Sequence, residues 1–177
     1  MIENERTYLA KSLPDLSNSS SSEMLDIYIP RAAEHPVLRI RCRGEKCEIT
    51  KKEPVQAGDA SRQSEQTIGL TETEFNELAG LEGKRIRKIR YVYDYQGRQC
   101  EIDVFQDHLE GLVLVDFEFA EAESQAMERF ELPDFCLAEV TQETFIAGGM
   151  LCGKSYGDIE GELARFNYQK LTLHQEA

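Results

Sequence analysis

The chain has 177 residues, of which 20 are Lys or Arg and 33 are Asp or Glu, so its formal net charge at pH 7 is −13. A field of this sign repels polyanions and argues against a general nucleic-acid or membrane-surface binder, so any anionic ligand must be held by a local basic cluster. Hydrophobic residues make up 41% of the chain, which is enough for the core of one domain over 1–177. No apolar run approaches the roughly 20 residues that cross a bilayer, and the N-terminus does not read as a signal peptide, which predicts a cytoplasmic protein.

The five cysteines form an odd set without a C-x-x-C pair. Their number and spacing argue against a disulfide framework and against a zinc ribbon, so we expect buried free thiols. These cysteines are Cys42, Cys47, Cys100, Cys136 and Cys152.

Most of the chain alternates apolar and polar residues with a period of two, which is typical of strands with two unlike faces. Two stretches interrupt the alternation and predict loops: the Ser-rich segment 17–22, and the segment 53–62, which contains Pro54 and Gly58. The predicted strands are 2–9, 24–29, 37–43, 47–52, 65–70, 85–93, 99–105 and 112–119.

Three segments have apolar residues at helical spacing instead. The first covers 71–81 and begins with a Thr-x-x-Glu capping box at Thr71. A second helix is predicted over 123–130. A third is predicted over 156–168, inside a C-terminal helical segment of about 150–170.

Charged residues gather on one face of several predicted strands. In the third strand, for example, Arg39 and Arg41 alternate with Leu38 and Ile40. For any one strand the simpler interpretation is a solvated face, because a water-facing pair of like charges costs about a kcal/mol or less. Pairs of like charge at i and i+2 nevertheless recur on five strands, as Glu3/Glu5, Arg39/Arg41, Lys88/Arg90, Glu101/Asp103 and Asp116/Glu118.

A barrel with these faces inward would give the charges a function. Charges in a confined lumen lose hydration and cost several kcal/mol each unless they are paired or hold a ligand. Basic side chains suit phosphate oxygens, and carboxylate pairs suit a hard divalent cation such as Mg²⁺ or Mn²⁺. Together the two sets predict a metal-assisted site for a polyphosphate.

The charged motifs also follow one another in a characteristic order. They are Glu3-Asn4-Glu5, Arg39-Ile40-Arg41, Lys52, Arg62 with Glu65, Lys88-Ile89-Arg90-Tyr91, Glu101-Ile102-Asp103 and Asp116-Phe117-Glu118. From Ile2 to about Arg165 this pattern resembles the CYTH superfamily, also called triphosphate tunnel metalloenzymes. The resemblance implies an α+β domain built round an eight-stranded antiparallel β-barrel, the tunnel, with helices packed outside.

The resemblance further implies roles for the charged residues. A metal-bound water, activated by a carboxylate, would attack a terminal phosphoryl group while basic side chains neutralise the nonbridging oxygens. The catalytic carboxylates would be Glu3, Glu5 and Glu118. The substrate-binding residues would be Arg39, Arg41, Lys52, Arg62, Lys88 and Arg90. The ligands of Mg²⁺ or Mn²⁺ would be Glu3, Glu5, Glu65, Glu101, Asp103, Asp116 and Glu118.

Position 7 departs from the family's pattern. The N-terminal motif is E-x-E-x-K, and this chain has Thr7 in place of the lysine. Loss of an ammonium group from a phosphate site costs roughly a hundredfold to a thousandfold in rate. Besides hydrolysis of inorganic tripolyphosphate or of a nucleoside or organic triphosphate, three alternatives stay open. They are a class IV-type adenylyl cyclase, a thiamine triphosphatase and, because of Thr7, a non-catalytic module that binds polyphosphate or nucleotide.

The expected partner is a small molecule that contains a triphosphate, with no nucleic-acid and no membrane partner. The sequence is compatible with a homodimer. The three histidines, His35, His108 and His174, fall near loops or in the tail and are not expected to bind a metal.

Overall fold

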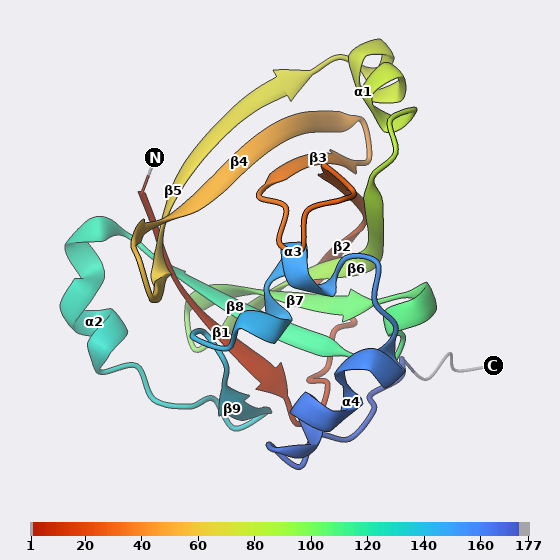
Figure 1. Ribbon diagram of the computed structural model, residues 1–177. Coiled ribbons are helices and arrows are strands. Elements are labelled where there is room, and N and C mark those ends of the chain that lie inside the picture. The colour runs from red at the N-terminus through yellow and green to blue at the C-terminus, as the bar shows by residue number, and fades with distance from the viewer. Residues whose placement is uncertain (1, 174–177) are drawn as a thin grey trace.

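The computed structural model describes residues 2–173, and its strands enclose a barrel (Figure 1). The strands are β1 (Ile2–Ala10), β2 (Ser20–Ile29), β3 (Leu38–Arg43), β4 (Lys46–Gln56), β5 (Asp59–Leu70), β6 (Lys84–Tyr95), β7 (Arg98–Phe105), β8 (Val113–Phe119) and β9 (Cys136–Glu139). The α-helices are α1 (Glu72–Ala79), α2 (Ser124–Glu128), α3 (Gly148–Leu151) and α4 (Tyr156–Ala164). Short 3₁₀ helices cover Asp107–Leu109, Glu121–Glu123 and Thr144–Ile146. Among the described residues, no helix has the length and apolar character needed to span a bilayer.

Strands β1 to β8 form a closed antiparallel barrel. Neighbouring strands follow the order β5-β4-β3-β2-β6-β7-β8-β1, and β1 closes the ring by pairing with β5, from Ile2 opposite Ser64 to Asn4 opposite Arg62. β9 adds to the other end of β1. The predicted fold, an eight-stranded antiparallel β-barrel of the α+β class with helices outside, is confirmed.

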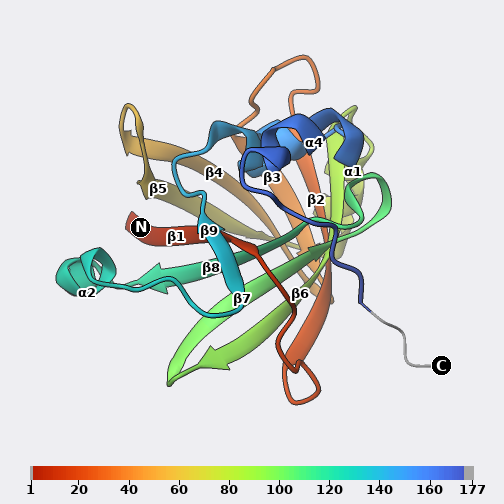
Figure 2. The same ribbon diagram turned by 90° about the horizontal axis from the view of Figure 1, so that it is seen from below.

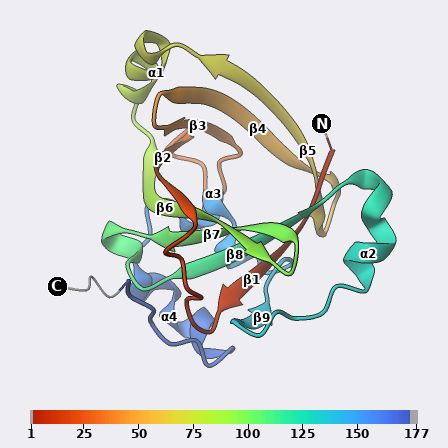
Figure 3. The same ribbon diagram turned by 180° about the vertical axis from the view of Figure 1, so that it is seen from behind.

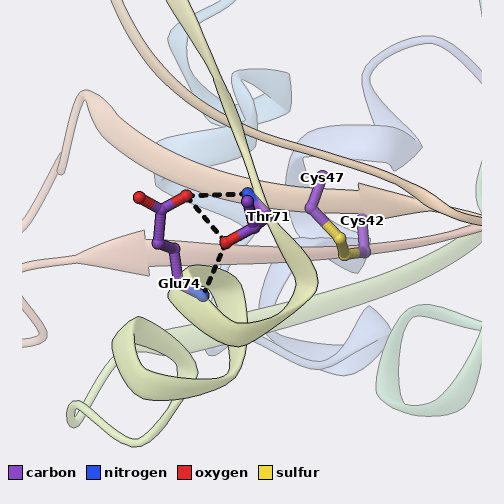
Figure 4. The surroundings of a disulfide bond; sticks show 4 residues. All are labelled: Cys42, Cys47, Thr71 and Glu74. Atoms are coloured by element: carbon purple, nitrogen blue, oxygen red, sulfur yellow. Dashed lines mark hydrogen bonds between the residues drawn. A yellow bond between two sulfur atoms is a disulfide. The ribbon is translucent and has the colours of Figure 1, made fainter.

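The outward faces of β2, β3 and β4 are covered by α1. Ile40 of β3 and Cys47 of β4 share a buried cluster with Phe75 of the helix. The predicted capping box is present, because the Glu74 N–H donates to Thr71 Oγ1 and the Thr71 N–H donates to the Glu74 carboxylate (Figure 4). Since side chains alternate across a strand, burial of one face under α1 leaves the other face to line the lumen.

The C-terminal segment closes one end of the barrel. The inward-facing apolar residues Leu9, Ile86 and Leu114 share a buried cluster with Leu151 of α3 and Ile159 of α4. Helix α3 lies across the barrel opening that faces the viewer in Figure 1 and behind the barrel in Figure 3, and Figure 2 shows α3 and α4 gathered at this end. This apolar plug leaves the charged inward residues to line the remaining cavity.

Two predicted loops are in part strands. The segment 53–62 extends β4 and β5 to a hairpin turn at Gly58, which has a φ of 84°. Pro54 is tolerated because β3 pairs with β4 only from Lys46 to Lys51. At Pro54, β4 therefore pairs only with β5. The last three residues of the Ser-rich segment likewise begin β2 and pair with β6.

The helical predictions are correct in place and too long in extent. The helix predicted over 123–130 is reduced to the five residues of α2. The helix predicted over 156–168 ends at Ala164, and Asn167 beyond it has a φ of 56°, which no helix continues. Strand β9 and helix α3 were not predicted, because four residues are too few to show a periodic pattern.

The expectation that all five cysteines are free thiols was wrong for two of them. Cys42 and Cys47 lie opposite each other in the β3–β4 ladder and form a disulfide (Figure 4). The hairpin turn between them, in which Gly44 has a φ of 57°, sets this register. The remaining cysteines are free and buried, namely Cys100, Cys136 and Cys152.

Candidate active site

A cavity of about 530 Å³ lies inside the barrel. All eight barrel strands contribute to its wall, together with residues 35–37 before β3, Gly58 in the β4–β5 turn and residues of the segment 141–151. Among the described residues, ten carboxylate side chains and five Lys or Arg side chains line it. An anionic ligand therefore needs either a favourable grouping of the basic residues or a cation that accompanies it.

Most of the residues predicted from the sequence reach this cavity. Those that line it are Glu5, Arg39, Arg41, Lys52, Glu65, Lys88, Arg90, Glu101, Asp103, Asp116 and Glu118. The side chain of Glu3 and all of His174 fall outside the residues that the structure describes. The opposing charge rows of the sequence are thus brought together in one lumen.

Among the predicted site residues whose side chains the structure describes, Arg62 is the one that does not line the cavity. Its neighbour Gln63 and the more distant Glu65 face the lumen, so strand alternation turns Arg62 outward. Its guanidinium lies 3.6 Å from the carboxylate of Glu121. The structure therefore separates Arg62 from the other basic residues.

Four neighbouring strands, β3, β2, β6 and β7, carry a basic wall that we define as Asp26, Arg39, Arg41, Lys88, Arg90 and Asp103. Arg41 donates from Nε and Nη2 to the two carboxylate oxygens of Asp26 at 2.5 and 2.7 Å. Asp103 accepts a hydrogen bond from Lys88 Nζ at 2.5 Å and two from Arg90, each at 2.7 Å. Arg90 also pairs with Glu101. These bonds fix three cations in place before a ligand binds.

The ionisation of the basic wall follows from these bonds. Burial alone would raise the pKa of Asp26, but Arg41, Lys88 and Arg39 outweigh it and lower the pKa to about 2. Burial acts on Asp103 in the same sense, and Arg90 and Lys88 hold its pKa well below the usual range. Both aspartates are therefore charged at neutral pH, and they balance the cations around them.

Arg39 differs from the other basic residues of the cavity. Among the described residues, the other four have a carboxylate within ion-pair distance, as in the 3.0 Å contact of Lys52 Nζ with Glu5, and Arg39 has none. It lies opposite Tyr28 of β2. Its Nε is buried without a hydrogen-bond partner in the described part of the chain. Arg39 is therefore held less firmly by the protein than the other four basic residues of the cavity.

The neighbouring strands β8 and β1 carry an acidic wall, which we define as Glu5, Asp116 and Glu118. Glu5 lies opposite Glu118, and Thr7 lies opposite Asp116 and donates from Oγ1 to its carboxylate at 2.7 Å. Burial, and then the charges of Glu5 and Asp103, raise the pKa of Asp116 to about 7. A carboxyl group with a raised pKa marks a position where an added positive charge is favourable.

The acidic wall has donors that suit a hard divalent cation. Carboxylate oxygens are the ligands that Mg²⁺ and Mn²⁺ prefer. Within residues 4–173, no three Asp, Glu, His or Cys side chains form a ready-made metal cage. Mg²⁺ commonly binds through one or two carboxylates together with substrate phosphates. The residues therefore fit a cation whose coordination shell is completed by phosphate oxygens of the ligand. They do not form a site that surrounds the cation with protein ligands alone.

Sequence reasoning missed several residues of the cavity wall. Asp26 carried a usable signal, because period-two alternation places it on the charged face of its strand. His35 lies between β2 and β3, and Gln142 follows β9, so neither belongs to a periodic segment. Gln142 donates a hydrogen bond to the Asp59 carboxylate and accepts one from the Ala60 N–H. These bonds attach the C-terminal segment to the β4–β5 hairpin.

Comparisons relate the chain to known proteins. No family model matches it. The inorganic triphosphatase of Nitrosomonas europaea is 32% identical over 145 residues, which are 81% of this chain and 91% of that protein. A crystal structure of an inorganic triphosphatase matches with a TM-score of 0.60 and 28% identity, covering 85% of this chain and 93% of that one. HpAC1 from Hippeastrum, described as having a dominant triphosphatase activity, shares the fold with a TM-score of 0.52 and 15% identity over 98% of this chain and 92% of its own. The chain belongs to the family of inorganic triphosphatases with the CYTH-like tunnel fold.

Proposed function

We propose that the chain is a divalent-metal-dependent triphosphatase, a single tunnel domain that hydrolyses a phosphoanhydride bond of a triphosphate inside the barrel. The observation that carries this proposal is the meeting of a basic wall and an acidic wall in one cavity of about 530 Å³. The relation to an inorganic triphosphatase supports it. Inorganic tripolyphosphate is therefore the first substrate to test, and organic triphosphates come next.

The basic wall would hold the phosphate oxygens. Arg39 would donate to them directly, since it lines the cavity without a carboxylate at ion-pair distance among the described residues. Arg41, Lys88 and Arg90 are already fixed by carboxylates, so little reorganisation accompanies the reaction. Lys52 of β4 pairs with Glu5 of β1 and would complete the grip on the opposite side. Positive groups around the nonbridging oxygens stabilise the charge of the phosphoryl-transfer transition state.

The acidic wall would hold Mg²⁺ or Mn²⁺. We assign Glu5, Asp116 and Glu118 as ligands, with Glu65 and Glu101 as further candidates, and Glu3 stays a prediction from the sequence. When bound, the ion polarises phosphate oxygens and lowers the pKa of a coordinated water. Asp103 is left out of this set, because Lys88 and Arg90 occupy both of its oxygens.

A carboxylate of the acidic wall would also accept a proton from the attacking water. Water attacks a terminal phosphorus, the bond from that phosphorus to the bridging oxygen breaks, and one proton of the water passes to a carboxylate of the acidic wall. Glu5 and Glu118 lie opposite each other and are the candidate bases. The leaving phosphate oxygen carries the negative charge, and the cations of the basic wall neutralise it.

A non-catalytic polyphosphate-binding module is the second candidate, and Thr7 favours it. The side chain at this position places a neutral hydroxyl, rather than the ammonium group implied by the family pattern, against Asp116. Binding by the basic wall does not depend on this position, whereas turnover would suffer from the missing charge.

Phosphate release by the purified full chain tests both candidates. Tripolyphosphate, ATP and thiamine triphosphate are each supplied with Mg²⁺, Mn²⁺ or EDTA. We expect release from tripolyphosphate that needs the metal and stops in EDTA. Tight, salt-sensitive binding of tripolyphosphate without turnover would establish the binding module instead. Formation of cyclic AMP from ATP would indicate a cyclase.

A further inference from the structure

Asp26 lies between two cations of the basic wall. It is 2% exposed, and it lies opposite Arg41 in the β2–β3 ladder. On the other side of β2, Lys88 of β6 lies opposite Met24. Met24 is two residues from Asp26, so Lys88 and Asp26 lie on the same face of the sheet. Across β3, β2, β6 and β7 the inward charges therefore alternate in sign as Arg41, Asp26, Lys88 and Asp103.

The surroundings of Asp26 do not suit a metal ligand or a general base. Each of its oxygens accepts a hydrogen bond from Arg41, one from Nε and one from Nη2. The charges that act on it come from Arg41, Lys88 and Arg39, and all three repel a metal cation. A carboxylate held this firmly in its charged form is a weak proton acceptor. A bidentate bond, in contrast, fixes the plane of a guanidinium group.

We propose that Asp26 is a positioning residue for phosphate binding: it holds Arg41 by Nε and Nη2 so that Nη1 is presented to a phosphate oxygen in the cavity. The inference rests on the proposed function, because it requires a phosphate ligand. It also predicts a change in binding affinity opposite to the one expected from net charge alone. Removal of a negative charge from the lumen should strengthen anion binding by charge alone, whereas loss of a positioning group should weaken it.

The test is a double-mutant cycle with tripolyphosphate as the probe. Asp26→Asn keeps the shape of the side chain and removes its charge. Binding is measured by titration calorimetry in EDTA, and KM and kcat are measured with Mn²⁺. We expect Kd and KM to rise by about tenfold to a hundredfold, with a smaller change in kcat. Arg41→Gln should lose a similar factor, and the double variant should lose no more than Arg41→Gln alone.

Controls separate this role from a general effect on the fold. Glu123→Gln breaks a 2.7 Å ion pair with Arg98 away from the cavity and should leave Kd unchanged. Far-UV circular dichroism and thermal unfolding establish that each variant is folded. Equal or tighter binding by folded Asp26→Asn would overturn the inference. A full additional loss on adding Asp26→Asn to Arg41→Gln would overturn it too, because Asp26 would then act through another group.

A measurement on the wild-type chain covers the case in which Asp26→Asn does not fold. The Nε–H proton signal of Arg41, identified by its loss in Arg41→Lys, should be narrow and slow to exchange without ligand. A broad, rapidly exchanging signal would contradict the inference. If the wild-type chain neither binds nor hydrolyses tripolyphosphate, the proposed function falls and the inference falls with it.

Discussion

The basic wall and the acidic wall face the same cavity, but their charges are balanced in different ways. In the basic wall, buried aspartates bond directly to three cations. In the acidic wall, Asp116 accepts a hydrogen bond from the neutral hydroxyl of Thr7. Burial and then the nearby carboxylates raise the pKa of Asp116 to about 7. One wall is therefore organised before the ligand arrives, and the other gains from a cation that arrives with it. The comparison supports our proposal that the first wall binds phosphate and the second binds the metal.

Arg90→Gln breaks the basic wall at its most connected cation, and we expect the largest effect from it. Arg90 bonds twice to Asp103 and pairs with Glu101. Removal of the partner of a buried charge should destabilise the fold by about 3 kcal/mol or more. Loss of a preorganised donor should lower kcat/KM for tripolyphosphate by about 10²–10³-fold. Urea unfolding and phosphate release measure these two losses.

Arg87→Gln is the matched control for that variant. Arg87 lies on the same strand, β6, and its ion pairs with Glu23 and Asp107, at 3.8 and 3.4 Å, are on the surface. Exposed pairs of this kind contribute about 0–1 kcal/mol, so stability should change by no more than that and activity should be unchanged. Equal damage from both variants would contradict the assignment of Arg90 to the site.

Arg39→Gln should separate binding from stability within the basic wall. Because Arg39 has no carboxylate partner among the described residues, its removal leaves no buried charge uncompensated. We expect kcat/KM for tripolyphosphate to fall by about a hundredfold with little change in melting temperature. Arg62→Gln, on the outer face, should change kcat/KM by less than about twofold. A comparable loss in both variants would return Arg62 to the site.

Strand alternation explains why the placement of most of these residues was predictable. Arg39 and Arg41, like Lys88 and Arg90, are two residues apart, so each pair must share a face whatever the exact ends of its strand. The structure does not place Arg62 with these residues, because it is three residues from Glu65 and cannot share its face in a regular strand. The family pattern placed the two residues together, while the local geometry separates them.

The pairings within the site were not predictable from alternation alone. The bond between Arg41 and Asp26 depends on the register of β2 against β3, which is set by side-chain packing across the ladder and by the turns. The disulfide between Cys42 and Cys47 depends in the same way on a short turn at Gly44. The segment 141–151 contains only a three-residue 3₁₀ helix and the four-residue helix α3, which are too short to give a periodic signal in the sequence.

The pH dependence of stability tests the charge excess of the acidic wall. The native pKa of Asp116 is about 7 against an ordinary value of 3.8, so the native state holds a proton that the unfolded chain has already released between these values. The stability of the metal-free protein should therefore fall as pH rises through this interval, by roughly 1–3 kcal/mol more than that of Asp116→Asn. Urea unfolding in EDTA between pH 5 and pH 8 measures the difference. Parallel curves for the two proteins would show that Asp116 does not titrate in this range.

Among the changes to residues that face the cavity, Thr7→Lys should have the smallest effect on activity, because it adds a charge that the surroundings are not arranged to use. The new ammonium group would lie beside Asp116, which in the wild-type chain accepts a hydrogen bond from Thr7 Oγ1 at 2.7 Å. Its charge should lower the pKa of Asp116 and so remove most of the pH dependence of stability described above. We expect kcat/KM for tripolyphosphate to rise by about tenfold or less. An unchanged rate would mean that position 7 does not limit turnover. A lower rate with weaker activation by Mg²⁺ would mean that the uncompensated negative charge of the acidic wall is what binds the cation, and that Thr7 preserves it.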